Sequence, residues 1–128
     1  MTTHHWTGRK PNPKKYFGFV YQITNKITGQ IYLGKKQYHR WTKRKIVGPN
    51  KWEYYAGSSK YLTKDIKTLG KENFEFKILK NFETRGGLVY GEANLLHKKD
   101  ALTKRNSDGD RVYYNRQIHA IKFIPKEG

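Results

Sequence analysis

A β-hairpin close to the N-terminus is the element that the sequence specifies most tightly. Residues 17–24 and 30–34 are two short runs rich in aromatic and β-branched side chains, and residues 25–29 between them read Asn-Lys-Ile-Thr-Gly, which suits a turn. Glycines inside or at the end of strands, here Gly18 and Gly34, often mark a close approach of another group to the backbone. The chain is therefore predicted to build its fold on antiparallel strands.

Helices and further strands follow this hairpin. Ser58 or Ser59 is expected to cap a helix that ends at Leu69 before Gly70, since leucine and isoleucine recur along it at helical spacing. The other expected elements are a basic loop over 35–51, a strand over 51–56, a strand that begins over 74–79, a loop over 84–87, a helix from 88 to about 102, a turn over 106–110, an extended piece over 112–115, and a helix or strand over 118–124. This mixture indicates an α+β domain.

The charge of the chain points to a polyanionic partner. Its 128 residues contain 27 Lys or Arg and 10 Asp or Glu, a formal net charge of +17. Solubility alone does not need so one-sided a balance, and nucleic acid is the default partner of a small chain this basic. The length fits one domain, and the absence of cysteine excludes a disulfide framework, a zinc finger and a thiol nucleophile.

The N-terminal segment is basic and interrupted by prolines. Residues 1–16 are expected to form an arm, which either lies along DNA phosphates or is a loose terminus, while residues 17–128 form the folded domain. No apolar run approaches the roughly 18 residues of a membrane span, and the first residues lack the apolar stretch of a secretory signal. We expect a cytoplasmic protein that is not secreted and has no membrane partner.

Glu92 is the most informative acid in the chain. On the helix expected from residue 88, it shares one stripe with Leu88, Leu95 and Leu96. A carboxylate among leucines costs free energy to bury unless a cation satisfies it. A hard cation such as Mg²⁺ is one such partner. A lysine, or a place at the edge of the stripe, is the other, and the residues alone leave both interpretations open.

Two tyrosines lie on the two strands of the hairpin. Tyr21 and Tyr32 are eleven residues apart across the turn, and partner strands can place two side chains on one face within about 5.5 Å. Nearby lysine or arginine charge is expected to lower a tyrosine pKa from its usual value of about 10. Such a phenol could orient or deprotonate water. The simpler interpretation is that both rings pack as ordinary strand residues.

The order of these residues resembles the GIY-YIG nuclease family, which is named for two tripeptides on a hairpin. Phe19-Val20-Tyr21 and Tyr32-Leu33-Gly34 match the tripeptides, Glu92 matches the single acid of a later helix, and Tyr114-Asn115 matches a Tyr-Asn element. The similarity covers residues 17–118. It implies a small, mainly antiparallel core sheet of three strands flanked by helices, and hydrolysis of a DNA phosphodiester.

The resemblance implies a role for each matching residue. Tyr21 would act as the general base or position the attacking water, and Tyr32 would hydrogen-bond near the scissile phosphate. Glu92 would be the sole protein ligand of one divalent metal, Mg²⁺ or Mn²⁺. Asn115 would be a supporting residue that holds the site together.

The chain departs from the family pattern after the second tripeptide. Lys35-Lys36 follows it directly, and a Gly-Ser-Ser-Lys stretch similar to the segment expected there comes later, over 57–60. The strand over 51–56 is therefore expected as an insertion, similar to that of some restriction-enzyme members with a lysine near the site. Tyr54 or Tyr55 on that strand could reach the site.

Several residues are candidates for the cation that clamps the phosphate. Lys36 is favoured, then Arg40 or Arg44, with Lys64 behind them, and His39 is either a second base or a surface histidine of the basic loop. Further DNA contacts are expected from Lys35, Trp41, Lys43, Lys45 and Lys60.

The expected function is that of a divalent-metal-dependent DNA endonuclease, either of the free-standing phage or mobile-element type or a compact restriction enzyme. One active site cuts one strand, so a double-strand break would need a homodimer, two binding events or a paired target. The competing interpretation is a non-catalytic nucleic-acid-binding protein on a degenerate nuclease fold, with Trp41, Trp52 and Tyr38 stacked on the bases of a single strand.

Overall fold

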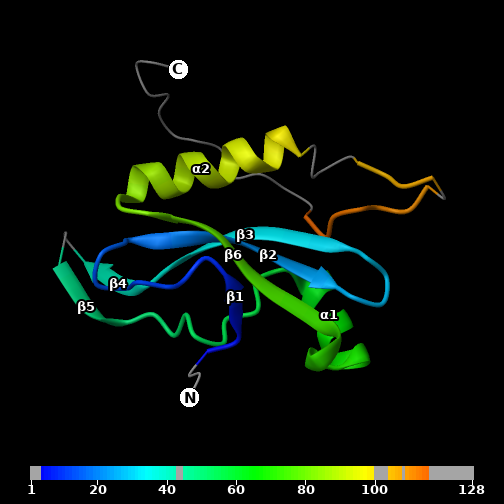
Figure 1. Cartoon of the computed structure of the whole chain (residues 1–128), viewed down its shortest axis with the longest axis horizontal. Coiled ribbons are helices and arrows are strands. Elements are labelled where there is room, and N and C mark those ends of the chain that lie inside the picture. The colour runs from blue at the N-terminus through cyan, green and yellow to red at the C-terminus, as the bar shows by residue number, and fades with distance from the viewer. Residues whose placement is uncertain (1–3, 43–44, 100–103, 108, 116–128) are drawn as a thin grey trace.

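A mixed four-stranded sheet forms the centre of the computed structural model, which describes residues 4–42, 45–99, 104–107 and 109–115. The strands are β1 (Trp6–Gly8), β2 (Gly18–Asn25), β3 (Ile31–Gln37) and β6 (Phe74–Phe82), in the spatial order β1-β6-β2-β3. Strand β2 pairs antiparallel with β3 and β6. Helix α2 lies along one face of this sheet and α1 lies at the other (Figure 1), which confirms the α+β fold.

The hairpin of β2 and β3 is confirmed, and β3 extends three residues beyond Gly34 to Gln37. The turn is closed by Asn25, whose buried side-chain oxygen accepts the backbone N–H groups of Ile27 and Thr28. Such an Asx turn satisfies backbone donors that no strand partner is placed to accept.

Residues 35–51 are not the loop that was expected. Beyond β3 they form a separate two-stranded ribbon of β4 (His39–Thr42) and β5 (Lys45–Pro49). The strand expected over 51–56 is wrong as well, because this segment is irregular, with a positive φ of 52° at Lys51 and a turn at Glu53 and Tyr54. Its aromatic residues do not alternate between two faces of a strand. Trp52 and Tyr55 pack from the turn against the main core.

Both expected helices are present. Helix α1 (Lys60–Leu69) begins after the cap Ser59, whose hydroxyl accepts the N–H of Leu62, and ends before Gly70. A 3₁₀ turn over Lys71–Asn73 joins it to β6. Helix α2 (Arg85–Lys98) begins three residues earlier than expected, because the side chain of Thr84 accepts the N–H of Gly87 and so caps the helix ahead of its two glycines.

The N-terminal segment contributes to the sheet. Residues 1–16 were expected to form an arm, but β1 within them pairs in parallel with β6, with Trp6 opposite Phe76. Trp6 is buried, and its indole N–H donates to the backbone oxygen of Trp52. The prolines at positions 11 and 13 come after β1 has already ended at Gly8, so they do not interfere with its pairing.

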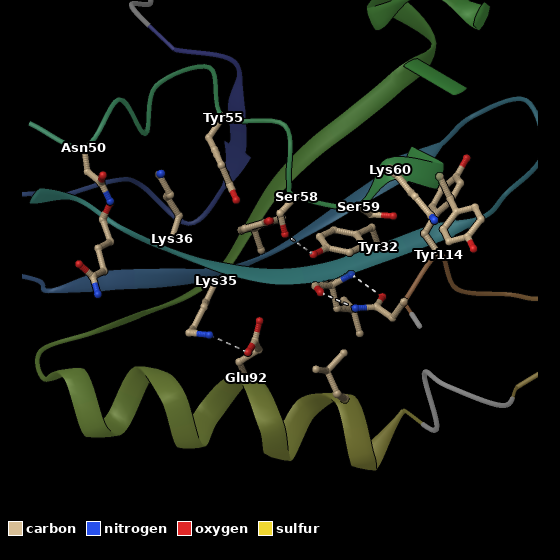
Figure 2. A pocket seen from close by; sticks show the side chains of 16 residues that line it. Tyr32, Lys35, Lys36, Asn50, Tyr55, Ser58, Ser59, Lys60, Glu92 and Tyr114 are labelled. Carbon is tan, nitrogen blue, oxygen red and sulfur yellow. Dashed lines mark hydrogen bonds and ion pairs between the residues drawn. The ribbon is translucent and has the colours of Figure 1, made fainter. Parts of the chain in front are cut away.

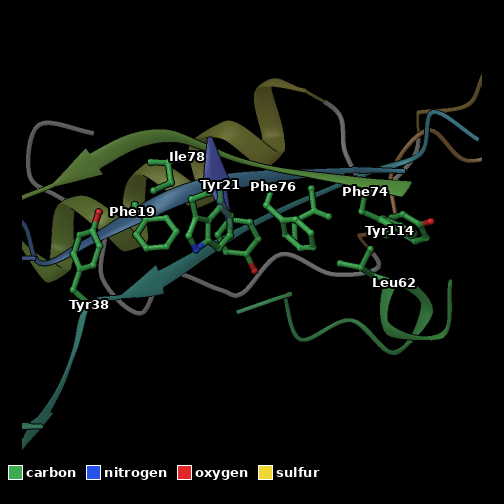
Figure 3. Packing of buried hydrophobic residues seen from close by; sticks show 10 residues of the cluster. Phe19, Tyr21, Tyr38, Leu62, Phe74, Phe76, Ile78 and Tyr114 are labelled. Carbon is green, nitrogen blue, oxygen red and sulfur yellow. The ribbon is translucent and has the colours of Figure 1, made fainter. Parts of the chain in front are cut away.

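The main core lies on the face of the sheet that carries α1. It is unusually aromatic (Figure 3), and its buried members are Trp6, Phe19, Tyr21, Ile23, Tyr38, Leu62, Phe74, Phe76, Ile78 and Tyr114. On the opposite face, leucines of α2 pack against the sheet in two smaller clusters, one around Leu33 and one around Phe17. The stripe expected on α2 is therefore the face that it buries.

The chain returns to the hairpin after α2. Tyr113 forms a parallel bridge with Ile31, in agreement with the extended piece expected over 112–115. The turn expected over 106–110 is closed by the backbone N–H of Gly109, which donates to the backbone oxygen of Asn106. The buried Tyr114 hydroxyl donates to Asp65 on α1 at 2.6 Å and accepts the Asn25 amide at 2.9 Å. The helix or strand expected over 118–124 lies outside the described residues.

Within the described part of the chain, no helix has the length and apolar character needed to cross a membrane.

We expect Tyr114→Phe to lower the free energy of unfolding by about 1–3 kcal/mol, because it removes the hydroxyl that joins Asn25 to Asp65. Urea denaturation followed by tryptophan fluorescence measures the loss. The control Tyr54→Phe removes a hydroxyl from a ring that is 59% exposed, and it should change the free energy by less than about 0.5 kcal/mol. Equal effects of the two substitutions would contradict this role of Tyr114.

Alkaline pH should weaken the fold through buried tyrosines. Burial raises the pKa of both Tyr38 and Tyr114 to about 12, from about 10 in an unfolded chain. As the pH rises past about 10, the unfolded chain releases protons that the native chain keeps. This contribution to stability is therefore complete below about pH 10 and is lost as the pH rises toward 12.

The comparison that isolates this contribution is between the wild type and Tyr38→Phe, whose ring cannot ionise. The fall in the urea midpoint between about pH 9 and about pH 11 should be smaller in the variant. An equal fall in both proteins would show that the Tyr38 pKa is the same in the folded and unfolded chains.

Candidate active site

A cleft of about 530 Å³ opens along the outer side of β3, the edge strand of the sheet. It is lined from several distant segments of the chain by Tyr21, Tyr32, Leu33, Lys35, Lys36, Gln37, Asn50, Tyr55, Ser58, Ser59, Lys60, Tyr61, Glu92, Leu96, Tyr114 and Asn115. Figure 2 shows side chains from both faces of β3 around it, with α2 on one side and the start of α1 on the other. The site is thus built around an edge of the sheet.

The strand register brings the two tyrosines together. Tyr21 is paired with Gly34 and Ile23 with Tyr32, so both rings lie on the same face, with centroids 6.1 Å apart. Gly34 makes this possible, because a Cβ at that position would lie 2.5 Å from the Tyr21 hydroxyl oxygen. The glycine of the second tripeptide therefore leaves room for the tyrosine of the first.

Tyr21 is almost fully buried and remains a neutral phenol. Burial raises its pKa well above the usual value, and the neighbouring Tyr32, Tyr55 and Glu92 raise it further. The expectation that nearby lysine charge lowers the tyrosine pKa is therefore wrong for Tyr21. Desolvation outweighs the attraction of nearby cations.

Tyr32 lies closer to solvent than Tyr21. Its hydroxyl shares a 3.3 Å hydrogen bond with Ser58, and burial raises its pKa as well. Ser58 immediately precedes the cap of α1, so the start of this helix sets the position of the Tyr32 hydroxyl.

Glu92 points from α2 toward the edge strand. It is 9% exposed, and its Oε1 lies 3.1 Å from Nζ of Lys35 on β3, with which it forms an ion pair. Of the two partners that the sequence left open, the lysine is therefore present. Figure 2 shows the second carboxylate oxygen of Glu92 directed away from Lys35 and into the cleft, where a ligand can bind it.

Lys36 lies on the other face of β3, as strand alternation requires. Its ammonium lies 4.0 Å from the centre of the Tyr55 ring, a cation–π contact. Burial lowers the pKa of Lys36. The cleft thus holds a partly desolvated cation on the face that also carries Tyr21 and Tyr32.

Asn115 fixes the edge of β3 from outside the sheet. Its side chain accepts the backbone N–H of Leu33 at 3.0 Å and donates to the backbone oxygen of the same residue at 2.8 Å. It therefore pairs with this residue as a neighbouring strand would. Leu33 lies between Tyr32 and Gly34, so Asn115 holds the second tripeptide in place.

The other candidates divide between the cleft and the rest of the surface. Lys60 lines the cleft, whereas His39, Arg40, Trp41, Lys45 and Lys64 do not. His39 bonds the backbone oxygen of Pro13 at 2.9 Å, and Trp41 packs on Phe17. Lys43 and Arg44 lie outside the described residues.

Ser58 and Asn50 were not among the site residues expected from the sequence. The Gly-Ser-Ser-Lys stretch was a usable signal for Ser58, since it resembles the segment that follows the second tripeptide in the family. Asn50 carried no such signal, because only the ribbon returns it to the cleft. Tyr55 lines the cleft, while Tyr54 lies outside it and is 59% exposed.

The donor set of the cleft suits one hard cation held by few protein ligands. Glu92 is the carboxylate among the lining residues, and one of its oxygens faces the cleft. Among the described residues, no three or more His, Cys, Asp or Glu side chains gather as a metal cluster. A divalent cation bound here would take its remaining ligands from water and phosphate, as Mg²⁺ commonly does.

Comparison with known proteins gives two matches. The model of the family described as "Putative endonuclease segE, GIY-YIG domain" matches residues 2–118. "Putative endonuclease segC" of Enterobacteria phage T4 is 30% identical over 112 residues, which are 88% of this chain and 48% of that protein. The chain thus spans about half the length of this relative. No solved structure matches.

The family match includes β1, the hairpin, both helices and Asn115, and so covers the parts of the fold that meet at the cleft. The chain belongs to the GIY-YIG endonuclease family.

Proposed function

We propose that this chain is a divalent-metal-dependent endonuclease that hydrolyses DNA phosphodiester bonds at the cleft beside β3. One observation carries the proposal. Tyr21, Tyr32, Lys36 and Glu92, which come from three different elements, line one cleft in a chain whose net charge is +17. The positive surface attracts the DNA backbone, and the cleft supplies the acid, phenols and cation that phosphodiester hydrolysis needs.

Tyr21 is assigned to the attacking water. Because its pKa is raised, the hydroxyl keeps its proton at neutral pH and acts first by position, with an oxygen lone pair that can accept a hydrogen bond from water. Tyr32, whose hydroxyl is held by Ser58, is assigned to a phosphate oxygen. The two rings lie on one face of the sheet with centroids 6.1 Å apart, so one bound phosphate can lie beside both.

Glu92 is assigned to the metal. A divalent cation on its carboxylate would stabilise negative charge on the phosphate and on the leaving oxygen. Lys35 neutralises the buried carboxylate through their 3.1 Å ion pair, so the site does not present a bare negative charge to the DNA backbone.

Lys36 is assigned to the phosphate clamp. It is the candidate cation that shares a face with both tyrosines and lines the cleft. Its partial burial removes some of the water that would otherwise weaken its attraction to a phosphate oxygen. Arg40 and Lys64 lie outside the cleft and are assigned to DNA backbone contacts, with Lys35 and Lys60 at the margin of the cleft itself.

The phage relative favours the phage or mobile-element type of nuclease over a restriction enzyme. The non-catalytic alternative receives less support, because one of the rings that it needs for base stacking is in the main core and a second packs against that core. Tyr38 is fully buried, and Trp52 packs against it with centroids 5.1 Å apart. A homodimer for double-strand cleavage and a cytoplasmic location stay predictions.

We expect the chain to cut plasmid DNA with Mg²⁺ or Mn²⁺ and to cut none in EDTA, and we expect Glu92→Gln to remove the cutting with either metal. The amide keeps the shape of the side chain but loses the charge that holds a hard cation. Agarose gels of supercoiled plasmid measure cutting, and fluorescence anisotropy with a labelled duplex measures binding, which Glu92→Gln should retain.

The matched control for this substitution is Glu83→Gln. It removes the same charge from an exposed residue just before α2 that does not line the cleft, and it should cut like the wild type. Cutting by Glu92→Gln at the wild-type rate would refute the assignment of the metal. A wild type that binds DNA and never cuts it would establish the non-catalytic alternative.

Tyr21→Phe should slow cutting by about 100-fold or more, because the attacking water loses the hydrogen bond that positions it, and misplacing a reacting group by about 1 Å can cost about that much. The ring still fills the core, so the variant should stay folded, with a duplex affinity close to that of the wild type and a urea midpoint lowered by no more than the loss of one buried hydroxyl, which hydrogen-bonds Tyr55. Tyr54→Phe is the control, since Tyr54 is exposed and lies outside the cleft. Full activity in a folded Tyr21→Phe protein would refute this assignment, and Tyr32 or Tyr55 would then be the candidate for positioning the attacking water.

A further inference from the structure

The β4–β5 ribbon is a projecting element whose exposed side chains the proposed chemistry does not use. It is a separate two-stranded sheet, placed in Figure 1 at the opposite end of the molecule from α1. Ile46 and Val47 on β5 are 53% and 51% exposed, and Lys45 and Arg40 beside them are exposed as well. Two adjacent aliphatic side chains in water, flanked by cations, indicate a surface that binds a partner with both apolar and anionic groups.

The base of the ribbon is firmly attached to the body of the protein. Trp41 packs on Phe17 with ring centroids 5.6 Å apart, and His39 bonds the backbone oxygen of Pro13. Asn50, just after β5, donates from its side chain to the backbone oxygen of Gln37. The exposed aliphatic side chains therefore belong to a positioned element, as a recognition surface requires.

The ribbon begins and ends at the cleft. Gln37, the last residue of β3, and Asn50, the first after β5, both line it. The ribbon is therefore within reach of a nucleic acid whose backbone lies in the cleft.

The dimensions of the ribbon fit the major groove of a duplex. Strands of four and five residues extend about 13–17 Å at about 3.3 Å per residue. The major groove is about 12 Å wide and about 8.5 Å deep and admits a two-stranded ribbon, whereas the minor groove is about 6 Å wide. A single strand is the poorer fit, because proteins bind single strands by stacking bases on aromatic rings, and the exposed side chains here are aliphatic.

A β-bulge presents the two aliphatic side chains together. Arg40 pairs with Gly48 and Trp41 with Ile46, so Val47 is the extra residue of β5. Bulges re-aim side chains, and here both Ile46 and Val47 are turned to solvent. Aliphatic groups at this place can contact the thymine methyl, a group that only the major groove exposes.

We propose that the β4–β5 ribbon binds in the major groove of duplex DNA next to the cleft, with Ile46 and Val47 against thymine methyl groups and Lys45 on the backbone. The proposal rests on the assignment of DNA as the substrate of the cleft. It names the duplex as the form of that substrate and the ribbon as the element that senses its bases.

The test compares two labelled duplexes of the same mixed sequence, about 30 base pairs long, one with thymine and one with uracil, which lacks only the methyl group. Anisotropy in EDTA prevents cutting. The wild type should bind the uracil duplex at least about threefold more weakly, and the Ile46→Ser/Val47→Ser protein should bind both duplexes equally and about tenfold more weakly than the wild type binds the thymine duplex.

Two controls separate this contact from general effects. Ile27→Ser removes an aliphatic side chain that is 58% exposed in the β2–β3 turn, and it should leave affinity and thymine preference unchanged. Lys45→Gln should weaken binding to both duplexes alike and reduce the slope of log K against log salt by about one, as expected for a lost phosphate contact. Circular dichroism and urea midpoints show whether each variant is folded.

A folded Ile46→Ser/Val47→Ser protein that keeps the affinity and the thymine preference of the wild type would overturn the proposal. So would a wild type without thymine preference, or a ribbon substitution that alters only self-association in sedimentation. These results are independent of cutting. Loss of the thymine preference in a chain that cuts nothing would support the ribbon contact and refute the nuclease.

Discussion

The register of the β2–β3 hairpin is the constraint on which the site depends. Side chains alternate between the faces of a strand, so a slip of one residue would send Tyr21 and Tyr32 to opposite faces. Three contacts hold the register. Asn25 closes the turn, Gly34 leaves space for the Tyr21 ring, and Asn115 pairs with both backbone groups of Leu33. Because these three features fix the hairpin, they also fix the positions of the hairpin side chains that line the cleft.

The position of β3 at the edge of the sheet explains why both faces contribute to one cleft. Consecutive lysines point to opposite faces, so Lys35 neutralises Glu92 on the side of α2 while Lys36 joins Tyr55 on the side of α1. A central strand would have kept these groups in separate compartments. The edge is protected against pairing with other chains by Asn115 and by the parallel bridge of Tyr113 with Ile31.

Sequence reasoning predicted the parts of the molecule that have regular periodicity or an end signal. The hairpin, α1 with its cap at Ser59, β6 and the stripe of α2 that holds Glu92 are of this kind. It failed for the ribbon, because His39, Arg40 and Trp41 show no alternation of polar and apolar residues. Strand β1 is three residues long, too short for any period, and it exists because Trp6 packs into a core assembled from distant segments.

Electrostatics could not be predicted from composition either. A net charge of +17 suggests that the pKa of a tyrosine in this chain should be lowered. The pKa of Tyr21 is instead raised. The charges lie mostly in water, where they are screened within about 10 Å, while Tyr21 packs in the aromatic core and lines the cleft with almost none of its surface exposed. Local burial therefore outweighs global charge. The same burial that keeps Tyr21 protonated also fixes its ring, so the residue can contribute to the reaction through the placement of its hydroxyl oxygen before it contributes through any loss of its proton.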